Sequence, residues 1–263
     1  MSDLDFLSFH MQSACELGGS QMRDVSYRNQ MIHAWSGPAC VVGTVISLVL
    51  IARLIPPPPA YLSADQVATM YRDHLLAIRF GLFLAIAATS LLIPFSVAIT
   101  VQMMRREGGR PVLAFTQLAG GATGALVLII AFMVMMMAAF DPARPVEITK
   151  AMHDMGWLML LLPYSPFCLQ YIVIAMVVLQ DTSGRPLFPR WIAYFNIWIA
   201  ISFIPTGLVG FFKTGPFTWH GLIGFWIPTI SYGTWFVVMF LALRSAIRED
   251  RLHDGSTARS GAV

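Results

Sequence analysis

The stretch that decides the fold lies at residues 111–140 and reads PVLAFTQLAGGATGALVLIIAFMVMMMAAF. It contains no Asp, Glu, Lys or Arg, and most of its side chains are apolar. The hydrocarbon core of a bilayer is about 30 Å thick, and roughly 20 apolar residues cross it as a helix. Because no water is present there to solvate charges or backbone groups, such a stretch is typical of a transmembrane helix.

Five further stretches of the chain have the same character. None of them contains Asp, Glu, Lys or Arg, and each is long enough to cross the hydrocarbon core. They are Asn29–Ala52, Phe80–Met104, Met155–Gln180, Trp191–Phe212 and Thr214–Leu243. The sequence therefore predicts an all-α, polytopic membrane protein, built as a bundle of six transmembrane helices.

The expected domain organisation leaves no room for a separate soluble domain, because 57% of the residues are hydrophobic and only 12% are charged. We expect a cytoplasmic N-terminal tail at 1–30, a transmembrane domain at 31–243 and a cytoplasmic C-terminal tail at 244–263 that frays. The six spans are expected at about 34–54, 80–104, 112–139, 156–180, 191–212 and 220–243. The first thirty residues lack the basic and apolar regions of a signal peptide, so the first span is expected to direct membrane targeting.

The distribution of Lys and Arg predicts the orientation, since short basic loops tend to stay in the cytoplasm. One side of the expected topology carries Arg23, Arg28, Arg105, Arg106, Arg110, Arg185, Arg190, Arg244, Arg248, Arg251 and Arg259, and the other carries Arg53, Arg72, Arg79, Arg144, Lys150 and Lys213. This bias predicts a multi-pass protein of the cytoplasmic, or inner, membrane with both termini inside. It also explains the net charge of +3 without a nucleic-acid partner.

The expected outer loops begin helices of their own. The four prolines at 56–59 end the first span, and the spacing of Ser63 and Gln66 is that of a capping box that starts a short amphipathic helix before span two. Pro145 and Pro216 are placed as first helical residues before spans four and six. Gly120 and Gly124 form a Gly-x-x-x-Gly pair that indicates either a dimerisation face or, as we favour, packing inside one bundle.

The spans contain no ionisable carboxylate or basic side chain, which disfavours ion-coupled transport, because proton and ion paths through a bilayer use such groups. Polar side chains do occur within them at Gln117, Gln170, Asn196 and Thr206. These residues are the candidates for lining a neutral pocket. Hydrogen bonds between helices are the other interpretation, and the more common one.

Three histidines, His74, His153 and His220, stand in the three expected outer loops, each just before an even-numbered span. Imidazole binds copper, zinc and haem iron, and thioether sulfur favours reduced copper. The histidines are therefore candidate metal ligands; the cofactor itself is not identified by the sequence, and copper and haem are the two candidates. Met152 and Met155 are possible further ligands, and Asp73 and Asp154 are possible orienting carboxylates.

The alternative interpretation is that these histidines and methionines bind no metal. Histidine and methionine are also common at membrane interfaces and in membrane helices without binding metal, and the three histidines share no short metal-binding spacing. The sequence has three cysteines, at Cys15, Cys40 and Cys168. No two of them form a Cys-x-x-Cys pair, and their spacing indicates no disulfide framework.

No catalytic motif of a known kind occurs in the sequence: it has no Gly-x-Ser-x-Gly elbow, no His-Glu-x-x-His and no phosphate-binding glycine loop. We therefore expect a non-enzymatic membrane protein that binds a small apolar or metal-containing ligand, or an accessory subunit of a membrane complex. Its expected partners are the lipid bilayer and either other membrane subunits or further copies of itself. The alternatives are a transporter of a neutral or hydrophobic solute and, less favoured, an enzyme with an outer His and Asp site.

Overall fold

The computed structural model describes residues 3–184 and 186–260, with side chains for 24–184 and 186–254. The described residues form helices and connecting loops without strands. The α-helices are α1 (Asp3–Val45), α2 (Ala64–Asp73), α3 (Leu75–Ser90), α4 (Leu92–Glu107), α5 (Val112–Phe140), α6 (Val146–Leu161), α7 (Ser165–Gln180), α8 (Arg190–Phe203) and α9 (Ile227–Ser260). Two π-helical segments, η1 (Ile46–Ile51) and η3 (Leu222–Trp226), and one 3-10 helix, η2 (Ile204–Phe211), join or extend them.

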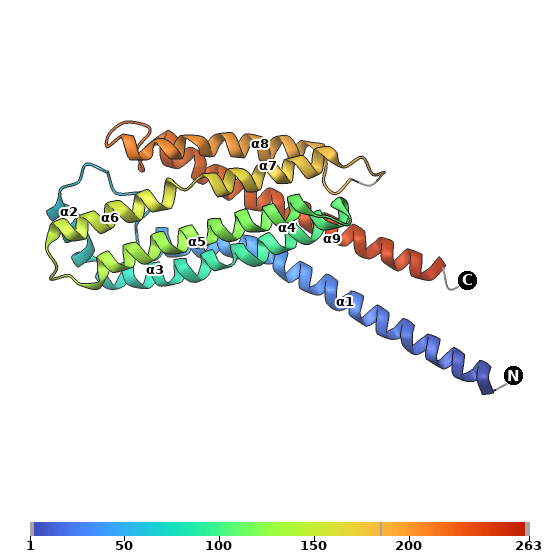
Figure 1. Ribbon diagram of the computed structural model, residues 1–263. Helices are drawn as coiled ribbons and strands as arrows, with labels where there is room; N and C mark the ends of the chain where they lie inside the picture. The colour runs from blue at the N-terminus through green and yellow to red at the C-terminus, as the bar shows by residue number, and fades with distance from the viewer. Residues whose placement is uncertain (1–2, 185, 261–263) are drawn as a thin grey trace.

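Six helical segments are long and apolar enough to cross a membrane, which confirms the predicted six spans. They are Asp24–Ile51, Leu75–Glu107, Val112–Phe140, Val146–Gln180, Arg190–Phe211 and Leu222–Asp254. Consecutive spans run antiparallel, and both termini lie at one end of the bundle (Figure 1). We call this end the terminal end and the opposite end, where α2 lies, the distal end.

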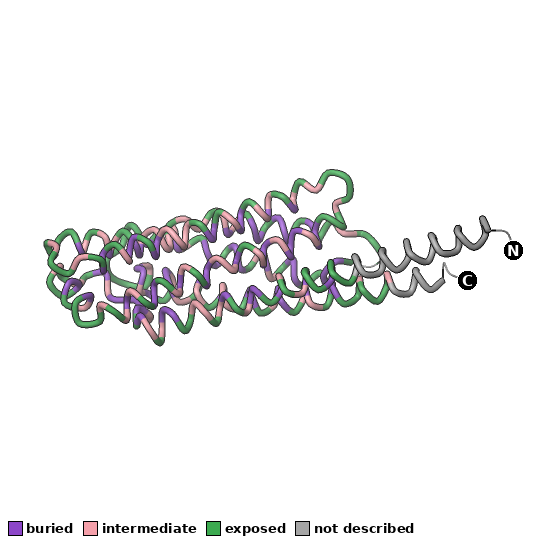
Figure 2. Tube along the Cα trace, turned by 90° about the horizontal axis from the view of Figure 1, so that it is seen from below, coloured by how far each residue is buried: buried purple, intermediate pink, exposed green. Residues whose placement is uncertain are grey.

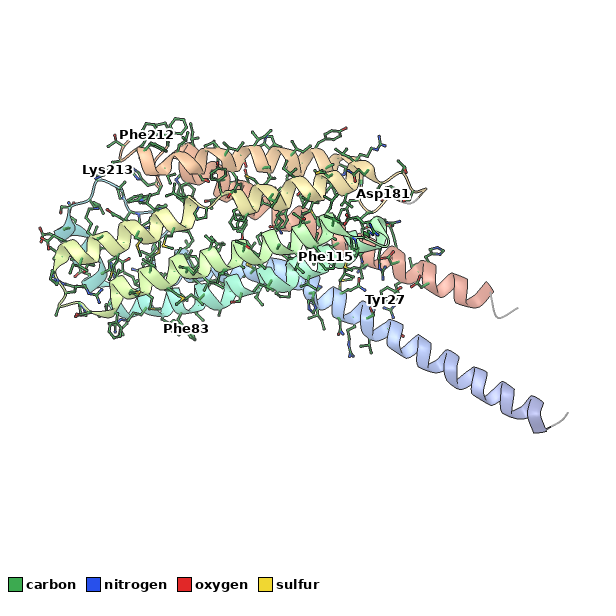
Figure 3. All side chains as sticks on the ribbon, viewed as in Figure 1. Tyr27, Phe83, Phe115, Asp181, Phe212 and Lys213 are labelled. Atoms are coloured by element: carbon green, nitrogen blue, oxygen red, sulfur yellow. The ribbon has the colours of Figure 1, made fainter. Side chains whose placement is uncertain are left out.

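The spans surround a common interior. α1 packs on α3, α4 and α9, α5 packs on α3, α4, α6 and α7, and α7 and α9 both pack on α8. Buried residues follow the inner faces of the helices, and exposed residues follow the outer faces (Figure 2). Large apolar side chains such as Phe83, Phe115 and Ile230 lie on the outer faces, with 61%, 54% and 63% of their surface exposed (Figure 3). An apolar exterior of this kind suits contact with lipid.

The two predicted tails differ from the structure. α1 begins at Asp3 and runs without interruption into the first span, and α9 continues to Ser260. The expected boundaries at 30 and 244 therefore lie inside helices. Charged and polar composition marks the edge of the hydrocarbon, but it does not end a helix, whose backbone hydrogen bonds are internal to the segment.

The connections at the distal end confirm one expected helix start and correct another. The Ser63 hydroxyl accepts a hydrogen bond from the Gln66 backbone N–H, and the Gln66 side chain accepts one from the Ser63 N–H, so the capping box of α2 is present. Pro145 directly precedes α6, as expected. Pro216, however, starts no helix, because its carbonyl instead accepts hydrogen bonds from the N–H groups of Ile223 and Gly224 and closes a loop before η3.

The Gly120 and Gly124 pair packs within the bundle. A Cβ atom added at Gly124 would lie 2.7 Å from the ring of Phe167, and one added at Gly120 would lie 3.0 Å from the carbonyl oxygen of Pro166. The pair thus allows the close approach of α5 and the start of α7, which is the intramolecular packing that we favoured from the sequence.

Candidate intramembrane ligand site

A cavity of about 320 Å³ lies inside the bundle, and residues from all six spans line it. Its walls are almost entirely apolar, and the described residues that line it include no Asp, Glu, Lys, Arg or His. Small-molecule sites in proteins typically enclose about 300–1,000 Å³ and are lined mainly by apolar and aromatic groups. The cavity therefore has the size and character of a site for a small, neutral ligand.

Interrupted helices surround this cavity. Its lining includes residues of the π-helical η1 and η3, of the 3-10 helix η2 and of the break at Pro163 and Tyr164 between α6 and α7. Prolines and π-helical turns are common causes of kinks, and irregular backbone inside a membrane is tolerated where it lines a cavity. The irregular segments of spans one, four, five and six therefore coincide with the site.

Aromatic rings form one wall of the cavity. The Phe167 ring lies 5.8 Å from that of Phe203 and 5.8 Å from that of Tyr232, and Phe203 and Tyr232 are themselves 6.2 Å apart between ring centroids. These three rings come from α7, α8 and α9, and each contributes to the lining. They join three spans around the ligand space by edge and tilted contacts of the usual kind.

At the terminal end, α1 and α9 are held together. The rings of Trp35 on α1 and Phe240 on α9 are in tilted contact with centroids 4.7 Å apart, and Asp24 pairs with Arg251 at 3.1 Å. The Tyr27 hydroxyl donates a hydrogen bond to the Asp254 carboxylate. This end of the site is therefore closed between α1 and α9.

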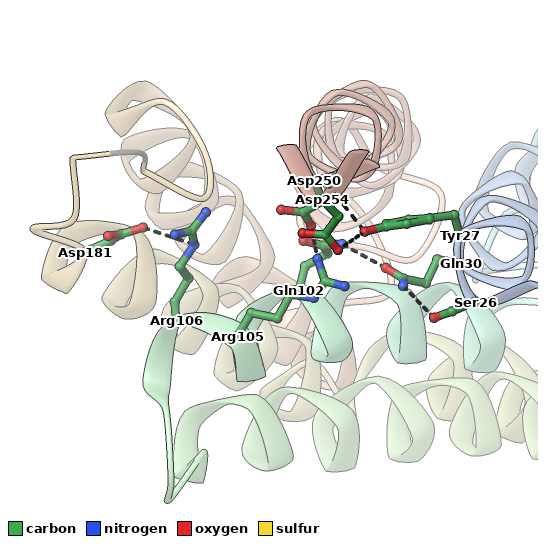
Figure 4. A network of polar contacts seen from close by, with 9 residues as sticks. All are labelled: Ser26, Tyr27, Gln30, Gln102, Arg105, Arg106, Asp181, Asp250 and Asp254. Carbon is green, nitrogen blue, oxygen red and sulfur yellow. Dashed lines mark hydrogen bonds and ion pairs between the residues drawn. The ribbon is translucent and has the colours of Figure 1, made fainter. Parts of the chain in front are cut away.

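The closure extends to α4 through a polar network (Figure 4). Arg105 pairs with Asp250 of α9, and the Gln102 side chain donates to Gln30 of α1 at 2.9 Å. Arg106 lies 3.7 Å from Asp181 after α7. Burial acts to raise the pKa of Asp181, but hydrogen bonds from Ser183 and Leu187 and the charge of Arg106 outweigh it and hold the pKa below its usual value.

In the distal half, α1 and α9 separate. η1, which continues α1, packs on α3, while η3, which leads into α9, packs on η2. Val45 of α1 lines the cavity and is 49% exposed. A Cβ atom added at Gly233, which also lines the cavity, would find no atom within 4 Å. The cavity therefore opens sideways, toward lipid, between the distal parts of spans one and six.

Of the polar residues predicted to line a pocket, Thr206 does so. The other three are buried and form hydrogen bonds outside the cavity lining: Gln117 accepts one from Thr100, Gln170 donates to Ser96 at 3.4 Å, and Asn196 accepts one from Trp235 at 2.9 Å. All three of these hydrogen bonds join different spans. They fit the other interpretation of the sequence, hydrogen bonding between helices.

The three predicted metal-binding histidines occupy different environments at the distal end. His74 is exposed at the end of α2, whereas His153 on α6 is buried, with 1% of its surface exposed. His220 is half-buried in the last loop, accepts a hydrogen bond from the Ala60 N–H at 3.2 Å, and has its pKa lowered by burial. Within the described residues, no group of three or more His, Cys, Asp and Glu side chains is placed to hold a metal ion.

The predicted neighbours of the histidines have other partners. Asp154 forms an ion pair with Lys150 at 2.8 Å, Met152 sulfur lies 2.8 Å from an Arg144 nitrogen, and Met155 is 47% exposed. Asp73 is exposed.

His153 is instead contacted by a residue that the sequence did not single out. The Tyr71 hydroxyl of α2 lies 3.2 Å from His153 Nδ1, while His153 Nε2 and Trp157 Nε1 are buried with no hydrogen-bond partner among the described residues. Arg79 donates hydrogen bonds to the carbonyls of Ala139 and Phe140 at the end of α5.

No protein-family model, curated protein or solved structure matches this chain. The cavity and the residues around it are therefore the basis for a functional proposal. The sequence contained only a weak signal for the cavity, namely the prolines and glycines of the last three spans, because such residues also occur in helices that merely bend.

Proposed function

We propose that this integral membrane protein is a non-enzymatic binder of a small, neutral, apolar molecule that it takes from the bilayer. The observation that supports this proposal is the cavity of about 320 Å³ at the centre of six spans, lined without charge and open toward lipid between α1 and α9. A charged ligand would lose its hydration there without gaining a counter-ion. An apolar ligand dissolved in the bilayer would need no path through water.

Saturable photolabelling tests this proposal. The full chain is placed in phospholipid nanodiscs with a diazirine-bearing hexadecane, and labelled peptides are identified by mass spectrometry. We expect unlabelled hexadecane to compete with labelling of cavity residues such as Thr44 and Phe225, and not with labelling of the lipid-facing Phe83 and Phe115. Labelling that is equally non-saturable at both sets of residues would contradict the proposal.

A transporter of a neutral or hydrophobic solute is the second candidate. The irregular segments η1, η2 and η3 favour it, because they line the cavity and lie on spans one, five and six, which would have to move to open the closed terminal end. Transbilayer movement of a fluorescent neutral lipid in proteoliposomes distinguishes the two functions. A binder retains the lipid without speeding its movement, whereas a transporter speeds it in proportion to the amount of protein.

We further propose that the protein lies in the cytoplasmic membrane with its terminal end inside, on the strength of the Lys and Arg bias. In a variant without native cysteines, Tyr61→Cys is expected to react with a membrane-impermeant maleimide in intact cells, because Tyr61 is 64% exposed at the distal end. Gly109→Cys, in the exposed turn between α4 and α5, is expected to react only after permeabilisation. The reverse pattern would invert the orientation.

A metal-containing ligand stays a prediction from the sequence. Copper, zinc and iron measured per purified chain decide it directly. Because two of the three histidines have hydrogen-bonding partners within the protein, we place the apolar molecule first.

A further inference from the structure

We propose that the ligand bears a hydroxyl or carbonyl oxygen, and that four threonines of the cavity wall bind this oxygen by hydrogen bonds. This inference rests on the proposed function and adds the chemical class of the ligand: a neutral lipid or lipid-like alcohol, ketone or quinone rather than a pure hydrocarbon. The residues are Thr44, Thr89, Thr206 and Thr229, and we call them the threonine girdle.

Thr44 and Thr229 lie at about the same depth of the bilayer. α1 and α9 run antiparallel, and two contacts fix how they align, Asp24 with Arg251 and Trp35 with Phe240. Continued along both helices, this alignment places Thr44 level with residue 231, within one turn of Thr229.

Thr89 and Thr206 lie near the same depth as Thr44 and Thr229. Phe203 and Tyr232 are in ring contact, and Thr206 and Thr229 each lie about one turn from them toward the distal end. Thr89 follows Ala88, whose Cβ would lie 2.8 Å from a Cβ added at Gly43, next to Thr44. The four threonines come from spans one, two, five and six, so four of the six spans that line the cavity contribute to this level.

The threonine hydroxyls have hydrogen-bonding capacity left for a ligand. Thr206 donates to the Phe203 carbonyl at 2.7 Å. Among the described residues, Thr89 and Thr229 have no hydrogen-bond partner for their side chains. Each threonine hydroxyl is one donor with two acceptor lone pairs, so the girdle can both donate to a carbonyl and accept from a hydroxyl.

The residues around the girdle restrict the chemical class of the ligand. Besides the girdle, the lining carries the polar groups of Cys40, Tyr164, Trp226 and Tyr232 among aliphatic and aromatic surface, with no charged side chain among the described residues. A carboxylate or phosphate headgroup would remain uncompensated there. A neutral oxygen on an apolar body instead satisfies the hydroxyls and fills the rest of the cavity, and hydrogen bonds of this kind specify orientation inside apolar pockets.

A matched pair of probes tests the inference on the full chain in nanodiscs: diazirine-bearing hexadecanol and diazirine-bearing hexadecane. We expect hexadecanol to saturate the labelling of cavity residues at a concentration roughly threefold to tenfold lower than hexadecane, the gain that one or two hydrogen bonds provide. In the double variant Thr89→Val and Thr229→Val, which preserves side-chain shape, this preference is expected to disappear while hexadecane labelling is unchanged.

The controls separate recognition from folding. Thr234→Val lies on α9 but is exposed and donates to the Ile230 carbonyl, so it is expected to keep the preference. Thr229→Ser, which retains the hydroxyl, is also expected to keep it. If the double variant does not fold, the single variant Thr229→Val replaces it and is expected to weaken the preference.

The possible outcomes separate the two proposals. Equal saturation by both probes overturns the girdle and leaves the apolar binding function standing, as does a preference that persists in the double variant. Saturable cavity labelling by neither probe overturns both.

Discussion

Gly233→Phe is expected to abolish saturable labelling of the cavity while the protein still folds. Gly233 lines the cavity, and a Cβ atom added there meets no atom within 4 Å, so a large side chain has space to grow into the ligand site. Phenylalanine would occupy a substantial part of the volume of about 320 Å³ and obstruct the opening between α1 and α9. Photolabelling in nanodiscs measures the loss, and we expect at least a tenfold drop in cavity labelling.

The matched control is Ile230→Phe, three residues away on the same helix. Ile230 is 63% exposed on the outside of the bundle, so a larger apolar side chain there should only contact lipid. Equal labelling of the cavity in both variants would show that the ligand does not use this space. Loss of labelling in both would point to a general effect on α9 rather than to occupation of the cavity.

Gly81→Leu is expected to destabilise the fold more than any other single change considered for the spans. A Cβ atom at this position would lie 2.6 Å from Ala52 Cβ, 2.7 Å from Ala52 N and 2.7 Å from the Ser47 carbonyl oxygen. Two of these atoms belong to the backbone, so η1 would have to move away from α3. Overpacking of a close contact typically costs about 1–3 kcal/mol, and a rigid backbone neighbour places this site at the upper end.

The yield of monodisperse protein and the thermal unfolding midpoint measure this effect. Gly233→Ala is the control, because it makes the same kind of substitution in open space and is expected to leave the midpoint unchanged or raised. Unaltered yield and midpoint in Gly81→Leu would mean that η1 is not held against α3 as described.

The spans could be predicted because the bilayer imposes a simple requirement on them. A window such as 111–140 must be helical and apolar throughout, and that property is visible residue by residue. The capping box at Ser63 was equally predictable, because both its hydrogen bonds join residues three positions apart. Pro216 was interpreted wrongly, since a proline that is compatible with a helix start is equally compatible with a loop.

The candidate site was far less accessible to sequence reasoning. Thr206 was predicted to line a pocket and does so, but Thr44, Thr89 and Thr229 were not singled out. Asn196 and Gln170 look like pocket residues by type and instead bond to Trp235 and Ser96. A cavity arises where helices diverge, and that divergence depends on how η1 and η3 pack against different neighbours rather than on any local pattern.

The histidines illustrate the same limit at the distal end. His74, His153 and His220 lie at the distal end of the bundle, since the spans that follow or contain them run in the same direction. Their different burial depends on α2 lying over α6, which brings Tyr71 to His153. Position along the chain predicts the side of a residue, whereas its partners depend on the packing of elements distant in sequence.

The most direct test of ligand binding in the cavity is the number of bilayer-derived neutral molecules that remain bound to the purified protein. The wild-type chain, Gly233→Phe and Ile230→Phe are purified in mild detergent, extracted with organic solvent and analysed by quantitative mass spectrometry. We predict about one oxygen-bearing neutral lipid per chain in the wild type and in Ile230→Phe, and almost none in Gly233→Phe. No neutral lipid in any of the three, or equal amounts in all of them, would contradict binding in this cavity.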